Sequence, residues 1–269
     1  MMPEPLPSVR DLLAFYLEAG VDCALSDEPV DRLSENNDVV EERPAPRPAL
    51  RADMPAPAVP RSEIAPAPDV AITSARELAP KAATLTELRA LLETFDGCAL
   101  KATATQLVFA DGNPEAKIMF IGEAPGRDED LAGRPFVGRS GKLLDLMIGA
   151  IGLDRTSAYI ANIIPWRPPG NRDPSPQETQ ICLPFIRRQI ELVDPDVIVC
   201  LGKPSSQAVL ELKDGIMKTR GRWYNYDTGK RTIRAMPTFH PAYLLRSPSY
   251  KRLTWQDLRA VRKALQPSS

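Results

Sequence analysis

Short apolar runs alternate with amphipathic stretches from about residue 105 onward. Four runs have the length and composition of buried strands: 117–122, 157–164, 196–202 and 231–239. Stretches with helical periodicity separate or follow them: 141–153, 175–193, 204–213 and 253–265. Strands that alternate with helices predict a parallel sheet covered on both faces. We therefore expect an α/β fold, a three-layer αβα sandwich around a four-stranded parallel sheet.

The first 83 residues follow a different pattern. Residues 8–25 have an amphipathic, helical periodicity and lead into an acidic segment, so 1–42 is interpreted as an N-terminal helix and acidic segment. Eight prolines among alanines and arginines follow within 43–69. Such a composition buries too little apolar surface to offset the entropy of ordering, so 43–83 is predicted to be a disordered Pro/Ala-rich linker. The folded domain is expected to span 84–269.

Composition and charge narrow the class of protein. The chain has no apolar run long enough to span a membrane and no N-terminal signal pattern, and its four cysteines are widely spaced. These features predict a cytoplasmic protein with reduced thiols. The net charge of −1 is unevenly spread, because residues 216–263 carry 12 Lys and Arg against two Asp. So basic a stretch favours a polyanionic partner such as nucleic acid.

Chemistry is expected where the strands end. Ligands of parallel α/β sheets bind beyond the carboxyl ends of the strands. The loop after the first strand, 122–138 (GEAPGRDEDLAGRPFVG), is rich in glycine and carboxylates. It matches neither a Walker A loop nor a dinucleotide-binding GxGxxG motif. The loop after the last strand, 239–245 (FHPAYLL), contains the only histidine of the chain.

Three long motifs resemble those of the family 4 uracil-DNA glycosylases. They are GEAPGRDEDLAGRPFVGRSGKLLD (122–145), ANIIPWRPPGNRDPSP (161–176) and PTFHPAYLLR (237–246), and the resemblance covers roughly 95–265. The resemblance implies an enzyme of base excision repair that flips uracil out of DNA and hydrolyses its N-glycosidic bond, leaving an abasic site.

The resemblance also implies a uracil pocket. Phe136 matches the aromatic side chain that stacks on the flipped base, and Asn162 matches the amide that reads its edge. His240 matches the histidine that donates to uracil O2 as negative charge builds on the base. Gly122 and Ala124 are expected to line the same pocket.

A DNA-binding segment follows His240. Leu244 is the first choice for an apolar wedge that fills the gap left by the extruded base, with Leu245 beside it. Arg246, Lys251 and Arg252 are expected to hold phosphates.

The carboxylate that orients the attacking water is left open by the sequence. Better-known uracil glycosylases carry an aspartate where this chain has Ala124. Glu123 is the first choice and Glu129 the second, with Asp128 and Asp130 as further alternatives.

The chain departs from the family at its iron–sulfur ligands. Family 4 enzymes typically hold a [4Fe–4S] cluster on four cysteines. Cys98 and Cys182 match two of these positions, but Lys101 and Trp166 replace the other two. We therefore expect no cluster and no metal, with a packing or cation–π contact between Lys101 and Trp166 in its place.

Two alternative functions remain open at this point. One is a catalytically weak module that binds uracil or abasic-site DNA, and the other is a glycosylase for a broader range of deaminated bases. Partners are expected to be uracil-containing and abasic-site DNA, with no membrane, and the protein is expected to be a monomer. Residues 1–42 are a candidate tether to a protein partner.

Overall fold

A computed structural model describes residues 68–266, which contain one six-stranded sheet of order β1-β3-β2-β4-β6-β5. The strands are β1 (Asp111–Gly112), β2 (Ile118–Gly122), β3 (Tyr159–Asn162), β4 (Val197–Leu201), β5 (Tyr224–Asp227) and β6 (Thr232–Thr238). The four predicted strands are confirmed as the parallel centre of this sheet. The two edge strands pair antiparallel and were not predicted. Their sequences explain this, since β1 has two residues and β5 reads YNYD, without a buried apolar run.

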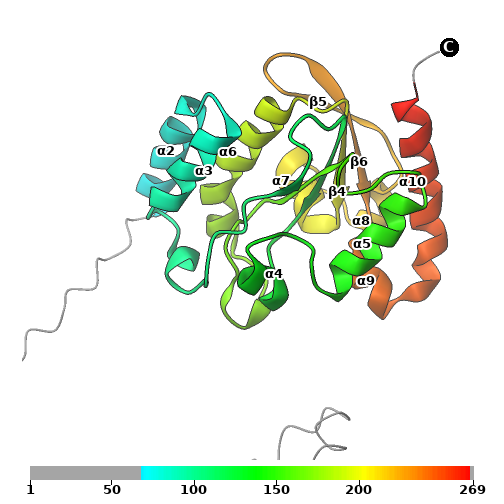
Figure 1. The fold of residues 1–269 in the computed structure, drawn as a ribbon, viewed down its shortest axis with the longest axis horizontal. Helices are drawn as coiled ribbons and strands as arrows, with labels where there is room; N and C mark the ends of the chain where they lie inside the picture. The colour runs from blue at the N-terminus through cyan, green and yellow to red at the C-terminus, as the bar shows by residue number, and fades with distance from the viewer. Residues whose placement is uncertain (1–67, 267–269) are drawn as a thin grey trace, which may run out of the picture. The chain divides into compact units, whose positions relative to one another are not determined.

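Helices cover both faces of the sheet (Figure 1). Besides α2, described below, they are α3 (Leu85–Thr94), α4 (Arg127–Ala132), α5 (Arg139–Gly149), α6 (Pro176–Val193), α7 (Lys203–Leu210), α8 (Ile216–Thr219), α9 (Pro241–Arg246) and α10 (Lys251–Leu265). Alternate residues of β2 show the two layers of core. Met119 and Ile121 pack with residues of α3 and α6, whereas Ile118 and Phe120 pack with residues of α5 and α10. The predicted three-layer sandwich is therefore observed.

The folded domain begins earlier than the sequence predicted. Helix α2 (Pro68–Leu78) and the short 3-10 helix η1 (Ala79–Lys81) pack on α6, with Ala71, Ala75 and Ala79 buried in the core. The boundary placed at residue 84 is wrong for this reason. Alanine-rich sequence was taken as linker, but small side chains are what allow two helices to pack closely. The predictions for 1–42 and for the proline-rich part of the linker up to residue 67 lie outside the described residues.

Helix ends follow local sequence signals. Ser175 caps α6 by accepting a hydrogen bond from the Glu178 backbone N–H at 3.2 Å, and the Glu178 carboxylate accepts the Ser175 N–H at 2.7 Å. At the start of α3, Thr84 accepts the Glu87 backbone N–H at 3.1 Å, and the Glu87 carboxylate accepts the N–H of Ala83 at 2.7 Å. None of the helices between residues 68 and 266 combines the length and hydropathy of a membrane span.

Candidate active site

A cavity of about 540 Å³ opens beyond the carboxyl ends of the parallel strands. Loops after β2, β3, β4 and β6 all contribute to its wall, as expected for a parallel α/β sheet. Seven predicted site residues line it, namely Glu123, Ala124, Glu129, Phe136, Asn162, His240 and Arg246. The fold therefore brings together side chains that are up to 123 positions apart in the sequence.

Gly122 and Asn162 occupy matching register positions at the ends of β2 and β3. Asn162 lines the cavity, whereas Gly122, which was expected to line it, contacts Asn162 and Phe136 without being part of the wall. A Cβ atom on Gly122 would lie 2.3 Å from Asn162 Oδ1 and 2.6 Å from Phe136 Cζ, so only glycine fits here. Asn162 is 4% exposed, and its Oδ1 has no hydrogen-bond partner among the described residues. A buried acceptor without a partner costs about 1–3 kcal/mol, which a ligand that donates a hydrogen bond would recover.

Phe136 adopts an unusual backbone conformation. Its φ of 55° lies in the left-handed region, which costs a non-glycine residue roughly 1–2 kcal/mol. The ring lies over the cavity side of Gly122 and 5.5 Å from the His240 ring, centroid to centroid. A strained but buried aromatic residue in a cavity wall indicates that the fold holds the ring in place for binding.

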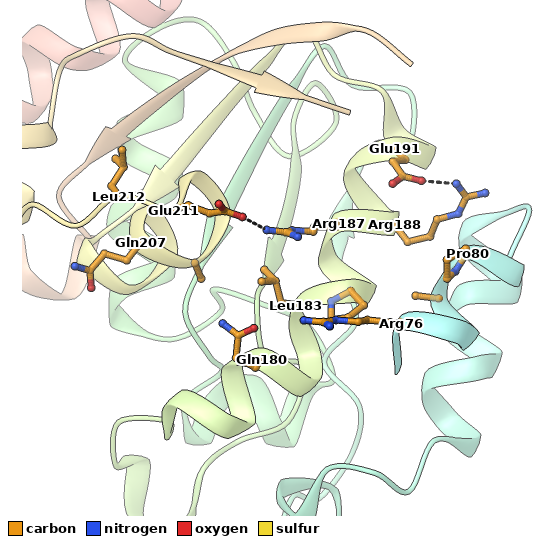
Figure 2. Close-up of a pocket in the computed structure, with 13 residues that line it drawn as sticks. Arg76, Pro80, Gln180, Leu183, Arg187, Arg188, Glu191, Gln207, Glu211 and Leu212 are labelled. Carbon is orange, nitrogen blue, oxygen red and sulfur yellow. Dashed lines mark hydrogen bonds and ion pairs between the residues drawn. The ribbon is translucent and has the colours of Figure 1, made fainter. Parts of the chain in front are cut away.

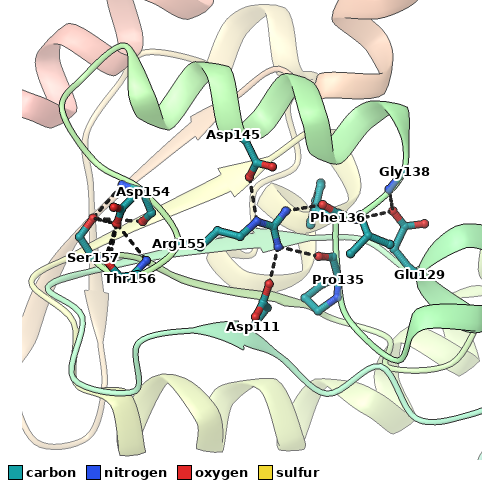
Figure 3. A network of polar contacts seen from close by, with 11 residues as sticks. Asp111, Glu129, Pro135, Phe136, Gly138, Asp145, Asp154, Arg155, Thr156 and Ser157 are labelled. Carbon is teal, nitrogen blue, oxygen red and sulfur yellow. Dashed lines mark hydrogen bonds and ion pairs between the residues drawn. The ribbon is translucent and has the colours of Figure 1, made fainter.

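Glu129 fastens the two ends of the glycine-rich loop to each other. Its buried carboxylate accepts backbone N–H groups of Gly126 at 3.1 Å, Val137 at 3.0 Å and Gly138 at 2.9 Å. Figure 3 shows Glu129 beside Gly138. With three donors already bound, this carboxylate has little remaining capacity to orient a water molecule. Its three hydrogen bonds instead stabilise the conformation of the loop that carries Phe136.

The two aspartates of this loop lie outside the cavity wall. Asp130 is buried and accepts hydrogen bonds from the backbone N–H and the hydroxyl of Thr105, both at 2.8 Å. Asp128 is exposed on the first turn of α4. Among the four carboxylates considered for the water, Glu123 is therefore the one that lines the cavity without a backbone partner.

Glu123 lies in an environment that disfavours its ionised form. Burial, with a smaller contribution from the negative charge of Asp173, raises the pKa of Glu123 to about 6. Asp173 also lines the cavity, from the loop after β3, and it was not singled out from the sequence. Its position in the GNRDPSP segment, directly beyond a strand, was the available signal.

His240 is presented as a neutral hydrogen-bond donor. Its Nδ1 accepts the backbone N–H of Ala242 at 3.1 Å, which leaves the proton on Nε2. Burial, assisted by the positive charge of Arg246, lowers the pKa of His240 to about 4. At neutral pH the ring is therefore uncharged, and Nε2–H is the group free to donate into the cavity.

The end of β6, two residues before His240, is hydrogen-bonded to the last helix, α10. The hydroxyl of Thr238 donates to Asp257 Oδ2 of α10 at 2.7 Å, and Arg220 forms an ion pair with the same carboxylate. The Arg220 guanidinium also lies over the Phe239 ring, 5.7 Å from its centroid. These contacts fix the strand immediately before the histidine.

Of the two leucines in helix α9, the one that was the second choice for the DNA wedge is the exposed one. Leu244 was the first choice for the DNA wedge, but it is 1% exposed and packs into the core with α5 and α10. That prediction is wrong, because Pro241 and Leu244 share the inner face of the helix through their i, i+3 spacing. Leu245 is 37% exposed, and Arg246, Lys251 and Arg252 are exposed beside it.

The loop after β4 supplies two residues that the sequence did not single out. Lys203 and Pro204, at the start of α7, line the cavity next to Gly202. Both residues directly follow the end of β4, but no motif in the sequence singles out their side chains.

A second cavity, of about 590 Å³, lies among α2, η1, α6 and α7 (Figure 2). It contains none of the predicted site residues. Two of its arginines are already paired, Arg187 with Glu211 at 2.7 Å and Arg188 with Glu191 at 2.5 Å. Although it is slightly larger, the chemistry of the strand ends favours the first cavity as the active site.

Comparison with known proteins agrees with this choice. Residues 109–259, which include the three long motifs, Trp166 and Cys182 but not Cys98 or Lys101, match the model of the uracil DNA glycosylase superfamily. The chain belongs to the uracil DNA glycosylase superfamily.

Individual relatives place the chain near one branch of that superfamily. The type-4 uracil-DNA glycosylases of Archaeoglobus fulgidus and Thermotoga maritima are each 41% identical to it over 168 residues. These alignments cover 61% of this chain and 84% and 86% of the two relatives. The type-4 enzyme of Pyrobaculum aerophilum is 34% identical over 178 residues, which is 91% of its length.

The position of the family 4 iron–sulfur cluster is differently built in this member of the superfamily. The Cys98 and Cys182 Sγ atoms lie 3.9 Å apart in the hydrophobic core. Trp166 belongs to the same part of the hydrophobic core and is 2% exposed. The Lys101 ammonium binds Asp96 Oδ1 at 2.6 Å and the Glu93 carbonyl at 2.8 Å. Among the described residues it makes no cation–π contact with Trp166, so of the two predicted contacts only packing stays a prediction. Two thiols, a bulky indole and a paired ammonium do not fit a four-thiolate cluster.

Proposed function

We propose that this protein flips uracil out of DNA and hydrolyses the bond between the base and C1′ of the sugar. One observation carries the proposal: a buried amide oxygen without a partner, a neutral histidine and an ordered aromatic ring face one cavity. This set matches a flat, uncharged ring with a hydrogen-bond donor and carbonyl acceptors on its edge. The names of the relatives support the same substrate.

Three side chains bind the base. Asn162 reads its hydrogen-bonding edge, because an amide offers both a donor and an acceptor. Phe136 stacks on its face. His240 Nε2–H donates to the carbonyl oxygen next to the breaking bond, where negative charge accumulates. A donor fixed before the reaction stabilises the transition state more than the ground state.

Glu123 orients the attacking water and stabilises the oxocarbenium-like sugar. A carboxylate serves both needs only when it is ionised. Its pKa of about 6 keeps it ionised at neutral pH. Glu129 is less suited to orient the water, because its oxygens already accept three backbone N–H groups.

DNA is held by the exposed side of α9 and the start of α10. Leu245, rather than the buried Leu244, enters the gap left by the extruded base. Arg246, Lys251 and Arg252 contact phosphates. The product is abasic DNA with an intact backbone, made by a monomer in the cytoplasm.

The reaction as proposed needs no metal or iron–sulfur cluster. The purified protein is expected to contain iron far below one atom per chain and to show no visible charge-transfer absorption. Four irons per chain, retained through purification, would contradict this part of the proposal.

The function is tested with a duplex oligonucleotide that carries a single uracil. Strand cleavage at that position only after alkali treatment would mean that the base was removed. The same oligonucleotide with thymine in place of uracil is the control. A gel shift with no alkali-labile site would instead indicate a binding module, and excision of hypoxanthine at a similar rate would indicate a broader glycosylase.

A further inference from the structure

One arginine binds the backbone of the loop that carries Phe136. Arg155 follows α5, and its guanidinium lies between Asp145 and Asp111 and points toward Pro135 and Phe136 (Figure 3). It donates to the carbonyl of Pro135 at 3.2 Å and to the carbonyl of Phe136 itself. Glu129 accepts the N–H groups of the next two residues, so the two side chains together bind two carbonyls and two N–H groups of the backbone from Pro135 to Gly138.

Two aspartates hold the guanidinium in that orientation. Asp111 of β1 accepts from it at 2.5 Å, and Asp145 of α5 accepts from its Nε at 2.8 Å. A planar guanidinium with five donors in fixed directions can serve two carboxylates and two carbonyls at once. The loop is thereby tied to a strand and a helix on either side of it.

Helix α5 closes the remaining space around the Phe136 carbonyl. A Cβ atom on Gly141 would lie 1.7 Å from this oxygen, so the helix backbone packs directly against it. The carbonyl is therefore confined between Gly141 and Arg155. This confinement explains how a phenylalanine is kept at a φ of 55° rather than relaxing to an ordinary conformation.

We propose that Arg155 is a positioning residue for base excision, which acts by fixing the Phe136 backbone so that its ring meets the flipped base. The inference rests on the proposed function, since it assigns a role at the same site. Without the guanidinium, the loop would lose both carbonyl contacts, and the ring would sample orientations in which it does not stack. Misplacement of a binding group by about 1 Å can lower a rate by about 100-fold.

The chain contains a matched arginine that tests the specificity of this role. Arg231 also binds two aspartates, Asp194 at 2.7 Å and Asp196 at 2.9 Å, and two carbonyls, those of Asp194 and Pro195. Its side chain is 40% exposed, against 25% for Arg155, and neither arginine lines the active-site cavity. Unlike Arg155, Arg231 has none of its partners in the loop that carries Phe136. Replacing Arg231 removes a similar set of bonds away from the site.

The experiment measures single-turnover excision of uracil for the full-length chain and its variants. Arg155→Gln is expected to lower the rate by about 100-fold and Arg155→Lys by less, whereas Arg231→Gln stays within about twofold. In a Phe136→Leu background, Arg155→Gln is expected to lower the rate by about threefold or less, because its effect passes through the ring. If Arg155→Gln fails to fold, Arg155→Lys carries the same comparison.

The outcomes separate this inference from the function. Equal losses from Arg155→Gln with and without Phe136, or a loss no larger than that from Arg231→Gln, would overturn the positioning role. A wild-type protein that releases no uracil would overturn the proposed function instead. Melting temperatures of all variants show whether any loss of rate reflects unfolding.

Discussion

Gly122 and Asn162 stand opposite each other at the ends of two paired strands, so close that a Cβ atom on the first would lie 2.3 Å from Oδ1 of the second. Gly122→Ala is therefore expected to push Asn162 and Phe136 out of position and to lower excision by about 100-fold or more. Gly149→Ala is the control, since nothing lies within 4 Å of its added Cβ. Equal excision rates for the two variants would show that the positions of Asn162 and Phe136 do not matter for binding the base.

The pH profile of excision reports on Glu123. Its raised pKa means that the carboxylate ionises only as the pH passes about 6, so the rate should rise through pH 6 and level off near neutrality. At pH 5 the rate is expected to be about tenfold below the plateau. His240, with a pKa of about 4, stays neutral across this range and adds no step.

Two variants identify the group behind that profile. Asp173→Asn removes a negative charge and should move the step to lower pH, because the pKa of Glu123 then falls. Glu123→Gln should lower the rate and flatten the profile. A step that survives unchanged in Glu123→Gln would assign the titration to another group.

Alanine substitutions of the two leucines of α9 are expected to affect different properties, stability for Leu244 and excision for Leu245. Leu244→Ala removes a core side chain and is expected to lower the free energy of unfolding by about 2–5 kcal/mol. Leu245→Ala should leave stability within about 0.5 kcal/mol and lower excision from duplex DNA more than from single strands. Denaturant unfolding and single-turnover assays distinguish them, and a large loss of stability in Leu245→Ala would contradict the assignment.

Helix α2 should behave as part of the folded domain. Ala75 is buried where α2 packs on α6, so Ala75→Asp places an unpaired carboxylate in the core and is expected to cost about 2–4 kcal/mol of stability. Thr73→Asp adds the same charge on the exposed face and should have a small effect. Equal melting temperatures for the two variants would instead support the prediction that residues 68–83 belong to the linker.

The sequence predicted the central sheet because its strands are continuous apolar runs. It missed the two edge strands, which are short or polar, and α2, whose alanines resemble linker composition. Phe136, Asn162 and His240 were found through their motifs, and each lines the cavity. Leu244 was misassigned because a motif gives the residue type but not which face of a short helix it occupies.

Arg155 shows the limit of motif reasoning most clearly. It lies in a turn with no recognisable motif, and its importance follows only from the two carbonyls and two aspartates that surround it in three dimensions. The sequence likewise placed Glu123 before Glu129 without a structural reason for that order. That choice depends on which carboxylate already has backbone donors.

The most direct test of the account is the release of free uracil from a duplex with a single uracil, measured together with the abasic sites formed. The wild-type protein is expected to yield one free base per abasic site, with the DNA backbone intact until alkali is added. His240→Ala and Asn162→Ala should each lower the rate by about 100-fold or more while the protein remains folded. Wild-type protein that binds the duplex but releases no base would contradict the central claim.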